Sequence, residues 1–318
     1  MQQLLNPTLT VVVPVYGNEG SIAPLIAALA TIKDAARVSF EAVFVVDGSP
    51  DRSYAMLREQ LPAARFDAKL ICLSRNFGAF SAIRAGLEHA TGSIIAVMAA
   101  DLQEPPELVL ELFRALAAGN RDIAMGVRES RDDPGASKLA SQAFWALYRR
   151  FVMPDIPKGG VDIFAVTAEM RDRLLQLKES NTSLLAQLFW LGGRREFVPY
   201  RRRRREHGKS AWTLKKKLRY LSDSVFTFTD LPIRLLMAIG LVSLCAGAGL
   251  LVLILAARIS GWVAVPGYAG TMVTILFFGA LNSLGLGVVG AYAWRTFENT
   301  KARPLSILQS LEIFKERE

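Results

Sequence analysis

Two long stretches without a charged residue constrain the fold of this chain more than any other feature. Residues 235–257 and 263–294 contain no Asp, Glu, Lys or Arg. Each stretch exceeds the roughly 20 apolar residues that an α-helix needs to cross a bilayer. Buried helices of soluble proteins seldom remain uncharged on every face over such a length. We therefore expect two transmembrane helices, joined by a short hairpin and preceded by a soluble domain.

Basic residues on both outer flanks of these stretches predict the orientation of the chain. Lys215–Lys217 and Arg234 precede the first stretch, Arg295 and Lys301 follow the second, and the hairpin between them contains Arg258. Lysine and arginine concentrate in the loops that remain in the cytoplasm. We therefore expect a multi-pass membrane protein whose soluble domain and both termini are cytoplasmic.

The composition argues against several classes of site. The formal net charge is +9, but the positive charges gather next to the apolar stretches, so we expect membrane lipids and no nucleic acid as the partner. The two cysteines, Cys72 and Cys245, fall in an expected strand and an expected span, which supports neither a disulfide framework nor a zinc site. Two histidines, His89 and His207, are too few for a histidine-built metal centre.

The first two-thirds of the chain alternate apolar strands with helices. Strands are expected at residues 9–15, 41–46, 69–73 and 93–97, each followed by a polar loop. Such alternation predicts a parallel, doubly wound α/β sheet, in which ligands bind at the carboxyl ends of the strands. A single polar loop of this kind is usually only a solvated connection. Four of them at one sheet edge favour a ligand site.

The pattern continues less regularly beyond the fourth strand. Residues 122–127 predict a fifth strand, and Gly159–Phe164 predict a turn into a sixth. Residues 138–151 and 181–192 predict helices.

The fourth loop carries the most specific chemistry. Asp101 and Gln103 stand two residues apart, directly after an apolar strand and before Pro105 and Pro106. Carboxylate and amide oxygens are hard ligands suited to Mg²⁺ or Mn²⁺ bridging a diphosphate. This turn therefore predicts a nucleotide-sugar site.

A basic segment precedes the first apolar stretch. Arg201–Arg205 form an unbroken run, which is ordinarily explained by a solvated face. Here Gly208 and Ser210 add turn chemistry that can cradle a phosphate. Residues 212–228 predict an amphipathic helix in the membrane interface.

Five motifs together resemble the family-2 glycosyltransferases that charge polyprenyl phosphates: VVVPVYGNEGS, VFVVDGSPDRS, LSRNFGAFSAIRAGL, AADLQEPPEL and RREHGKSAW. The resemblance is to the membrane-anchored bacterial branch with the GtrB-type glucosyltransferases and the aminoarabinose transferases, and more distantly to dolichyl-phosphate mannose synthases. It spans nearly the whole chain, including the paired apolar stretches. DLQ-x-PPE combined with RNFG and R-x-x-G-x-S is highly specific, whereas VPVY alone is common.

The resemblance implies a GT-A fold of the doubly wound, Rossmann-like type, followed by interfacial helices and two transmembrane helices. The implied reaction is inverting transfer of one sugar from a nucleotide sugar, UDP-linked, to polyprenyl (undecaprenyl) phosphate. It would take place at the cytoplasmic face of the bacterial inner membrane, for cell-envelope glycan or lipopolysaccharide modification. Mg²⁺ or Mn²⁺ is the implied cofactor, and a homo-oligomer is expected because tetramers occur among the relatives.

This reading divides the chain into four parts. A cytoplasmic GT-A domain is expected at residues 1–211 and a juxtamembrane amphipathic helix at 212–232. Two transmembrane helices with a short extracytoplasmic hairpin are expected at 233–296, and a cytoplasmic C-terminal tail at 297–318.

The resemblance also implies roles for individual residues. Asp101 and Gln103 match the metal ligands, and Arg205 matches a residue that meets phosphate. Asp162 or Glu104 would orient sugar hydroxyls. The positions that match contacts to nucleotide or phosphate are Pro14, Tyr16, Glu19, Asp47, Arg75, Arg128, Arg131, Arg202 and Ser210.

Two positions depart from the family's pattern. Val46 replaces one of two adjacent acids before the second loop, and Ala99 replaces the first acid of the usual D-x-D. The diphosphate and water would then complete the metal's ligand shell. Ala99 also leaves open a catalytically weakened membrane scaffold that recruits a glycan-assembly partner. A processive polysaccharide synthase is disfavoured, since its Q-x-x-R-W motif is not seen.

Overall fold

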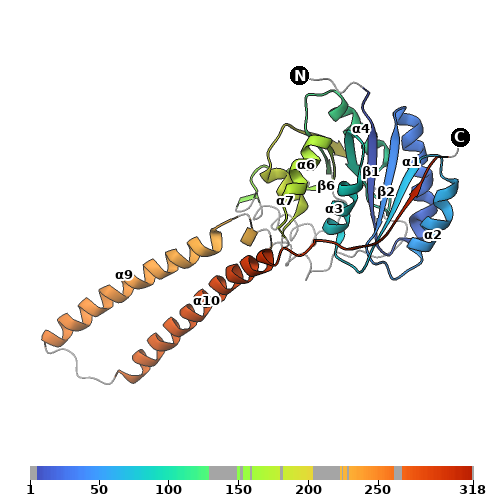
Figure 1. Ribbon diagram of the computed structural model, residues 1–318. Helices are drawn as coiled ribbons and strands as arrows, with labels where there is room; N and C mark the ends of the chain where they lie inside the picture. Colours follow the sequence, from blue (N-terminus) through green and yellow to red (C-terminus); the bar gives the residue numbers. More distant parts are fainter. Residues whose placement is uncertain are drawn as a thin grey trace. The chain divides into compact units, whose positions relative to one another are not determined.

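The computed structural model of the 318-residue chain describes residues 6–128, 149–150, 153–157, 160–179, 182–202, 223, 225–227, 229–260 and 267–316. The chain divides into two compact units. Unit 1 comprises Met1–Leu218 and Arg303–Glu318, and unit 2 comprises Arg219–Ala302. Figure 1 shows a layered α/β arrangement in unit 1 and two long helices in unit 2.

Unit 1 is built around an eight-stranded sheet with the order β7-β5-β6-β4-β1-β2-β3-β8. Its strands are β1 (Leu9–Val15), β2 (Phe40–Val46), β3 (Asp67–Leu73), β4 (Ile94–Val97), β5 (Ile123–Arg128), β6 (Val161–Thr167), β7 (Arg195–Tyr200) and β8 (Leu308–Phe314). The four central strands β4, β1, β2 and β3 are parallel neighbours, as the alternating pattern predicts.

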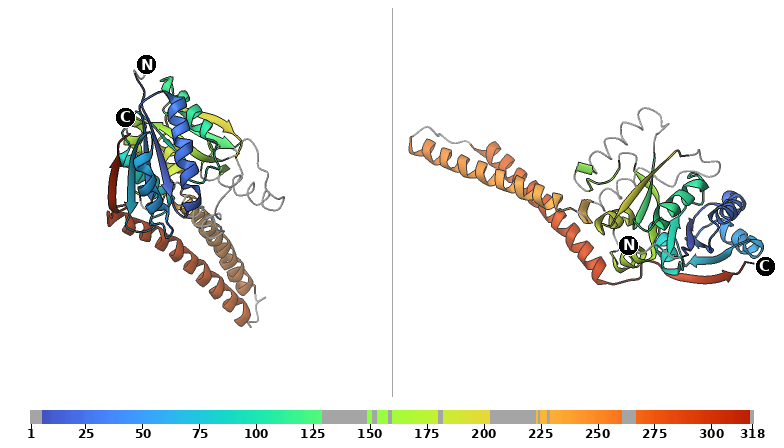
Figure 2. Two further views of the ribbon diagram at one scale, coloured as in Figure 1. Left: turned by 90° about the vertical axis from the view of Figure 1, so that its right-hand side faces the viewer. Right: turned by 90° about the horizontal axis from the view of Figure 1, so that it is seen from above.

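Helices cover both faces of this sheet (Figure 2). They are the 3-10 turns Glu19–Ser21 and Leu61–Ala63, and α1 (Ile22–Ala36), α2 (Ser53–Gln60), α3 (Ala79–His89), α4 (Pro106–Ala117), α6 (Ala168–Gln176) and α7 (Leu184–Trp190). On one face α1 packs against α2 and α4, and on the other α3 packs against α6.

The central strand β1 shows why these segments are so apolar. Val11 and Val13 belong to the core cluster that includes the buried side of α1. Val12 points to the opposite face, where it lies so close to Gly86 of α3 that a Cβ there would fall 2.3 Å from Val12 Cγ1. A strand buried on both faces reads as a continuous apolar run rather than an alternating one.

The complete sheet is mixed, which differs from the parallel sheet expected from the sequence. β6 runs antiparallel to both of its neighbours, β4 and β5, and β8 runs antiparallel to β3. After β4 the chain passes through α4 and enters β5, which is not the neighbour of β4 in the sheet. β6 lies between β4 and β5 and runs antiparallel to both. The mixed α/β sheet is GT-A-like.

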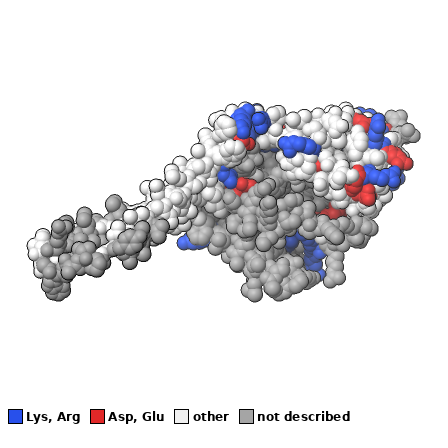
Figure 3. Space-filling model, turned by 90° about the horizontal axis from the view of Figure 1, so that it is seen from below, with Lys and Arg blue, Asp and Glu red and all other residues white. Residues whose placement is uncertain are grey.

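The last strand comes from the segment that was expected only as a cytoplasmic tail. β8 extends the sheet beyond β3, and Glu312 accepts hydrogen bonds from Tyr54 Oη (2.6 Å) and Arg58 Nε (3.0 Å). Lys315 Nζ lies 2.8 Å from the Asp67 carboxylate. Figure 3 shows such positive and negative side chains intermingled on the described part of one face. The C-terminal segment Leu308–Phe314 is therefore part of the sheet of unit 1.

Unit 2 contains two long helices, α9 (Leu231–Ile259) and α10 (Tyr268–Thr300). Within the described residues, one helical stretch, Phe277–Thr300, has the length and composition to cross a membrane. The apolar stretch Leu231–Gly247 of α9 is shorter. One membrane-spanning segment thus has support from the structure, and the second stays a prediction.

The segment before α9 contacts the end of α10 within unit 2. Residues 223 and 225–227 are helical, in the range where an interfacial helix is expected. Arg295 Nη2 donates a 2.7 Å hydrogen bond to Asp223, and Tyr292 Oη donates one of 3.3 Å to the carbonyl of Thr229.

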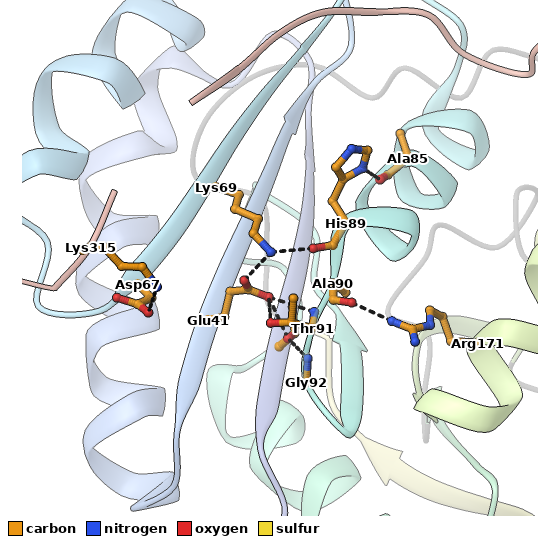
Figure 4. A network of polar contacts seen from close by, with 11 residues as sticks. Glu41, Asp67, Lys69, Ala85, His89, Ala90, Thr91, Gly92, Arg171 and Lys315 are labelled. Carbon is orange, nitrogen blue, oxygen red and sulfur yellow. Dashed lines mark hydrogen bonds and ion pairs between the residues drawn. The ribbon is translucent and has the colours of Figure 1, made fainter. Parts of the chain in front are cut away.

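A polar network stabilises the edge of the sheet at the amino ends of β1, β2 and β4 (Figure 4). Lys69 Nζ lies 2.7 Å from Glu41 Oε1, and Glu41 Oε2 accepts hydrogen bonds from Thr10 Oγ1 and from both Thr91 N and Thr91 Oγ1. Burial favours the neutral carboxyl, but the hydrogen bonds from Lys69 and Thr91 outweigh it. The pKa of Glu41 therefore lies below its ordinary value.

We predict that Lys69→Met lowers the free energy of unfolding by about 2–3 kcal/mol at pH 7, because it leaves a largely buried carboxylate without its cation. A depressed pKa stabilises the fold above pH 4.5 and less as the pH falls, so the difference from the wild-type protein should narrow below pH 4.5. Chemical denaturation of the detergent-solubilised chain at several pH values measures both effects. The exposed Arg65, 3.9 Å from Asp34, is the control. Equal losses in Lys69→Met and Arg65→Met would contradict the prediction.

Candidate active site

The topology gathers the expected site residues at one edge of the sheet. The loops after β1, β2, β3 and β4 lie at this edge because these strands are parallel neighbours. β5 and β7 end at the same edge, and the antiparallel β6 begins there. Arg128 at the end of β5, Asp162 near the start of β6 and Arg202 after β7 are thereby placed at the edge that carries Asp101.

The first two loops are connected by reciprocal hydrogen bonds. Gly17 N donates to Ser49 Oγ at 2.8 Å, and Glu19 N donates to Asp51 Oδ2 at 3.0 Å. In return, Arg52 N donates to Glu19 Oε2 at 3.1 Å. Glu19, which the resemblance places among the nucleotide contacts, thus uses one carboxylate oxygen to shape the loops.

Asp51 is a residue of these loops that the sequence reasoning did not select. Its Oδ1 accepts hydrogen bonds from Ser49 Oγ (2.6 Å) and from Ser53 N (3.1 Å) at the start of α2. Burial opposes its ionisation, but the hydrogen bonds from Ser49, Ser53 and Glu19 outweigh burial and hold the pKa of Asp51 below its ordinary value. The signal was an aspartate between two serines shortly before a helix, since aspartate often accepts a hydrogen bond from the backbone N–H two residues later.

Asp47 connects the second loop to the third. The residue is 3% exposed, and its two oxygens accept hydrogen bonds from Phe77 N (2.7 Å) and Gly78 N (2.8 Å). Burial raises the pKa of Asp47 despite these bonds and the nearby Arg75. The expected contact to base or ribose would use the second lone pair of each oxygen. Val46, where the family has an acid, is buried.

The same two loops approach each other closely at Gly48. Its φ of +56° lies in the left-handed region, and a Cβ there would fall 2.4 Å from Arg75 C and 2.5 Å from Asn76 N. The Arg75 guanidinium in turn lies 4.0 Å from the centroid of the Phe77 ring. The glycine is required because backbone meets backbone at this point.

Two further expected residues lie on β1 and its loop. Pro14 is the second-last residue of β1, opposite Val45 of β2 in the register. Tyr16 is 46% exposed and its backbone N–H donates to Asn18 Oδ1. Its ring is accessible at the edge where a nucleotide is expected.

The acidic turn after β4 has a strained backbone. Leu102 has a φ of +55°, an uncommon conformation for a residue with a bulky side chain. The turn lets Asp101 Oδ1 accept a 3.3 Å hydrogen bond from Gln103 N. Strained residues of this kind cluster at functional sites because the surrounding structure must hold them.

The donor set of this turn fits a divalent cation in part. Asp101 contributes a carboxylate and Gln103 an amide oxygen, both hard ligands. Ala99 contributes none, and the described residues contain no group of three or more His, Cys, Asp or Glu side chains that could hold a metal. Further oxygens would have to come from a bound diphosphate and water.

Arg202 connects the end of β7 to this turn. Its Nη2 donates a 2.8 Å hydrogen bond to Gln103 Oε1, and its Nε lies 3.5 Å from Oε1 of the buried Glu104. The sequence predicted a role for Arg202 but gave no indication that it contacts Gln103 and Glu104. Arg131, Arg205 and Ser210 lie outside the described residues.

Comparison with known proteins decides the family. The model of "Glycosyl transferase family 2" matches residues 10–175, from β1 into α6. The chain belongs to glycosyltransferase family 2. This confirms the family expected from the five motifs, and the protein is a glycosyltransferase.

Similar proteins cover nearly the whole chain. An uncharacterized glycosyltransferase of Synechocystis sp. is 33% identical over 305 residues, 95% of each chain. Undecaprenyl-phosphate 4-deoxy-4-formamido-L-arabinose transferase of Edwardsiella ictaluri is 32% identical over 310 residues, 95% of this chain and 93% of that protein. Among solved structures, a mannosyltransferase of Pyrobaculum calidifontis in complex with GDP-Man and Mn²⁺ is 16% identical, with a TM-score of 0.46 over 92% of this chain and 89% of that one.

We predict that Gly48→Ala lowers the free energy of unfolding by about 3 kcal/mol and abolishes nucleotide binding, because its Cβ forces the two loops apart. Gly17→Ala is a matched control: its φ is +68°, but a Cβ there meets nothing within 4 Å. It should cost only the about 1–2 kcal/mol of a left-handed alanine. Denaturation and calorimetric titration with UDP measure the two effects. Equal stability of the two variants would refute the close loop packing.

Proposed function

We propose that this glycosyltransferase moves one sugar, with inversion, from a UDP-linked nucleotide sugar to polyprenyl phosphate, undecaprenyl phosphate in a bacterium. The proposal rests on one observation: the acidic turn with Asp101 and Gln103 lies at the same sheet edge as two arginines. These are Arg128 at the end of β5 and Arg202, which contacts Gln103. Donor diphosphate and acceptor phosphate are both anions, and arginine is suited to binding each. The similar Edwardsiella protein carries undecaprenyl phosphate in its name.

The acceptor determines what the protein must supply. A phosphate monoester has a second pKa near 6, so it is largely dianionic at neutral pH and needs no strong general base. Its oxygen forms the new bond to the anomeric carbon while the bond from that carbon to the diphosphate breaks. The bonding electron pair leaves with the nucleoside diphosphate. Catalysis then consists of aligning the two substrates and neutralising the leaving group.

Named residues take these roles in the proposal. Asp101 and Gln103 would hold Mg²⁺ or Mn²⁺, which neutralises charge on the leaving diphosphate. Arg128 pairs with donor phosphate, and Arg205 pairs with the acceptor phosphate. Asp162 or Glu104 orients sugar hydroxyls, and the sugar is to be identified by a panel of donors. Arg131, Arg202 and Ser210 remain proposed phosphate contacts, and a homo-oligomer remains a prediction.

The returning strand β8 supports two membrane crossings. β8 and β3 pair in one sheet, so the chain on both sides of unit 2 lies on the same side of a membrane. A chain that leaves and returns crosses an even number of times. If Phe277–Thr300 crosses, α9 must supply the second crossing, and its 29 residues at about 1.5 Å each exceed a core about 30 Å thick. The basic residues that flank the apolar stretches favour the cytoplasmic side for both segments, so we propose the bacterial inner membrane, with unit 1 and both termini cytoplasmic.

We predict that Asp101→Asn lowers transfer from nucleotide sugar to undecaprenyl phosphate at least about a hundredfold, because the turn loses the carboxylate proposed as a metal ligand. A panel of radiolabelled donors with the wild-type protein identifies the sugar, and the exposed Asp172→Asn is the control. Near-normal product from Asp101→Asn would refute the metal assignment. A wild-type protein that neither transfers nor hydrolyses any donor would instead favour the scaffold.

We predict that Ser260→Cys, between α9 and α10, is labelled by a membrane-impermeant maleimide in intact cells, whereas Ser306→Cys before β8 is labelled only after lysis. Cys72 and Cys245 are replaced by serine beforehand. The reason is that two crossings, with unit 1 in the cytoplasm as proposed, place residue 260 outside and β8 inside. Labelling of both positions in intact cells, or of neither, would refute the two-crossing topology.

A further inference from the structure

A cation of the chain itself already contacts a proposed metal ligand. The Arg202 guanidinium donates through Nη2 to Gln103 Oε1 at 2.8 Å. Its Nε faces Oε1 of Glu104 at 3.5 Å, and the Glu104 side chain is only 2% exposed. The guanidinium therefore lies on the turn that follows β4, between a buried carboxylate and the amide oxygen.

The amide oxygen is the part of Gln103 that a metal ion would use. A guanidinium that donates to this oxygen carries a full positive charge, and a divalent cation on the same oxygen would lie within a few ångströms of it. Like charges at such a distance repel strongly outside bulk water. The attraction for a metal ion is weaker still because Ala99 has no carboxylate. Asp101 is then the one carboxylate that remains of the usual pair.

We propose that Arg202 competes with the divalent metal for Gln103, and that the nucleoside diphosphate releases it. A diphosphate offers the planar guanidinium a bidentate, doubly charged partner, which an amide oxygen cannot match. When Arg202 turns to the diphosphate, Gln103 becomes available to the metal. The inference rests on the proposed function, since it assumes that the Asp101–Gln103 turn binds metal and donor together.

The competition makes binding of metal and nucleotide cooperative. A metal ion that binds alone must break the contact between Arg202 and Gln103, and Arg202 gains no other partner. When nucleoside diphosphate is also bound, Arg202 pairs with the diphosphate and the metal does not have to displace it. By linkage, each ligand then raises the affinity for the other by the same factor. Arg202 also belongs to the run Arg201–Arg205, whose Arg205 the proposal assigns to the acceptor phosphate.

The test is a titration of the full-length, detergent-solubilised protein with Mn²⁺, followed by electron paramagnetic resonance, with and without UDP. Arg202→Gln should bind Mn²⁺ without nucleotide on the order of tenfold more tightly than wild type, and UDP should then raise its Mn²⁺ affinity less. Arg202→Lys, which keeps a charge and a donor, should stay near wild type. The exposed Arg65→Gln, with the same change in net charge, should match wild type.

A second background separates the contact from long-range charge. In Gln103→Ala, adding Arg202→Gln should change Mn²⁺ affinity little, because the shared oxygen is gone. An equally large tightening in that background, or an unchanged Mn²⁺ affinity in Arg202→Gln alone, would overturn the competition. The proposed function fails separately, if wild type binds Mn²⁺ and UDP yet transfers no sugar to undecaprenyl phosphate.

Discussion

The parallel register of β4, β1, β2 and β3 brings four polar loops to one edge of the sheet, and the candidate site depends on this register. The loops do not hold their positions alone. Asp47 connects the second to the third through Phe77 N and Gly78 N, and Asp51 connects the second to the first through Glu19 N. Both carboxylates therefore hold neighbouring loops together, so a nucleotide would bind to loops that are already connected by hydrogen bonds.

The electrostatics of this edge are unusual for the family that the motifs indicate. Val46 and Ala99 stand where the resemblance implies acids, so the turn after β4 offers Asp101 without the second carboxylate of the usual pair. Arg202 is bound to the remaining turn through Gln103 and Glu104. A metal turn with one carboxylate of the usual pair and a nearby arginine needs oxygens from an anionic substrate, which agrees with the proposed donor diphosphate.

The C-terminal strand links the membrane question to the sheet. β8 lies beyond unit 2 in the chain, yet it pairs with β3 over its length and is fastened by Tyr54 and Arg58 through Glu312. If unit 2 crosses a membrane, this pairing requires an even number of crossings. The segment LQSLEIF is apolar at four of its seven residues, but its sequence does not show that it pairs with β3, which lies far away in the chain.

Local patterns in the sequence determined the four central strands, the loops that follow them, the apolar stretches and the acidic turn. Continuous apolar runs between turn residues arise wherever a strand is covered on both faces, and polar loops after such strands fall at a predictable edge. Only the tertiary structure decided that β6 and β8 run antiparallel, that Asp51 and Asp47 join loops, that Leu102 adopts a left-handed conformation, and that Arg202 contacts Gln103. These features depend on contacts between residues far apart in the chain, 99 positions for Arg202 and Gln103 and 258 positions for Tyr54 and Glu312. Sequence periodicity records which side of an element is buried, but it does not record which distant partner buries it.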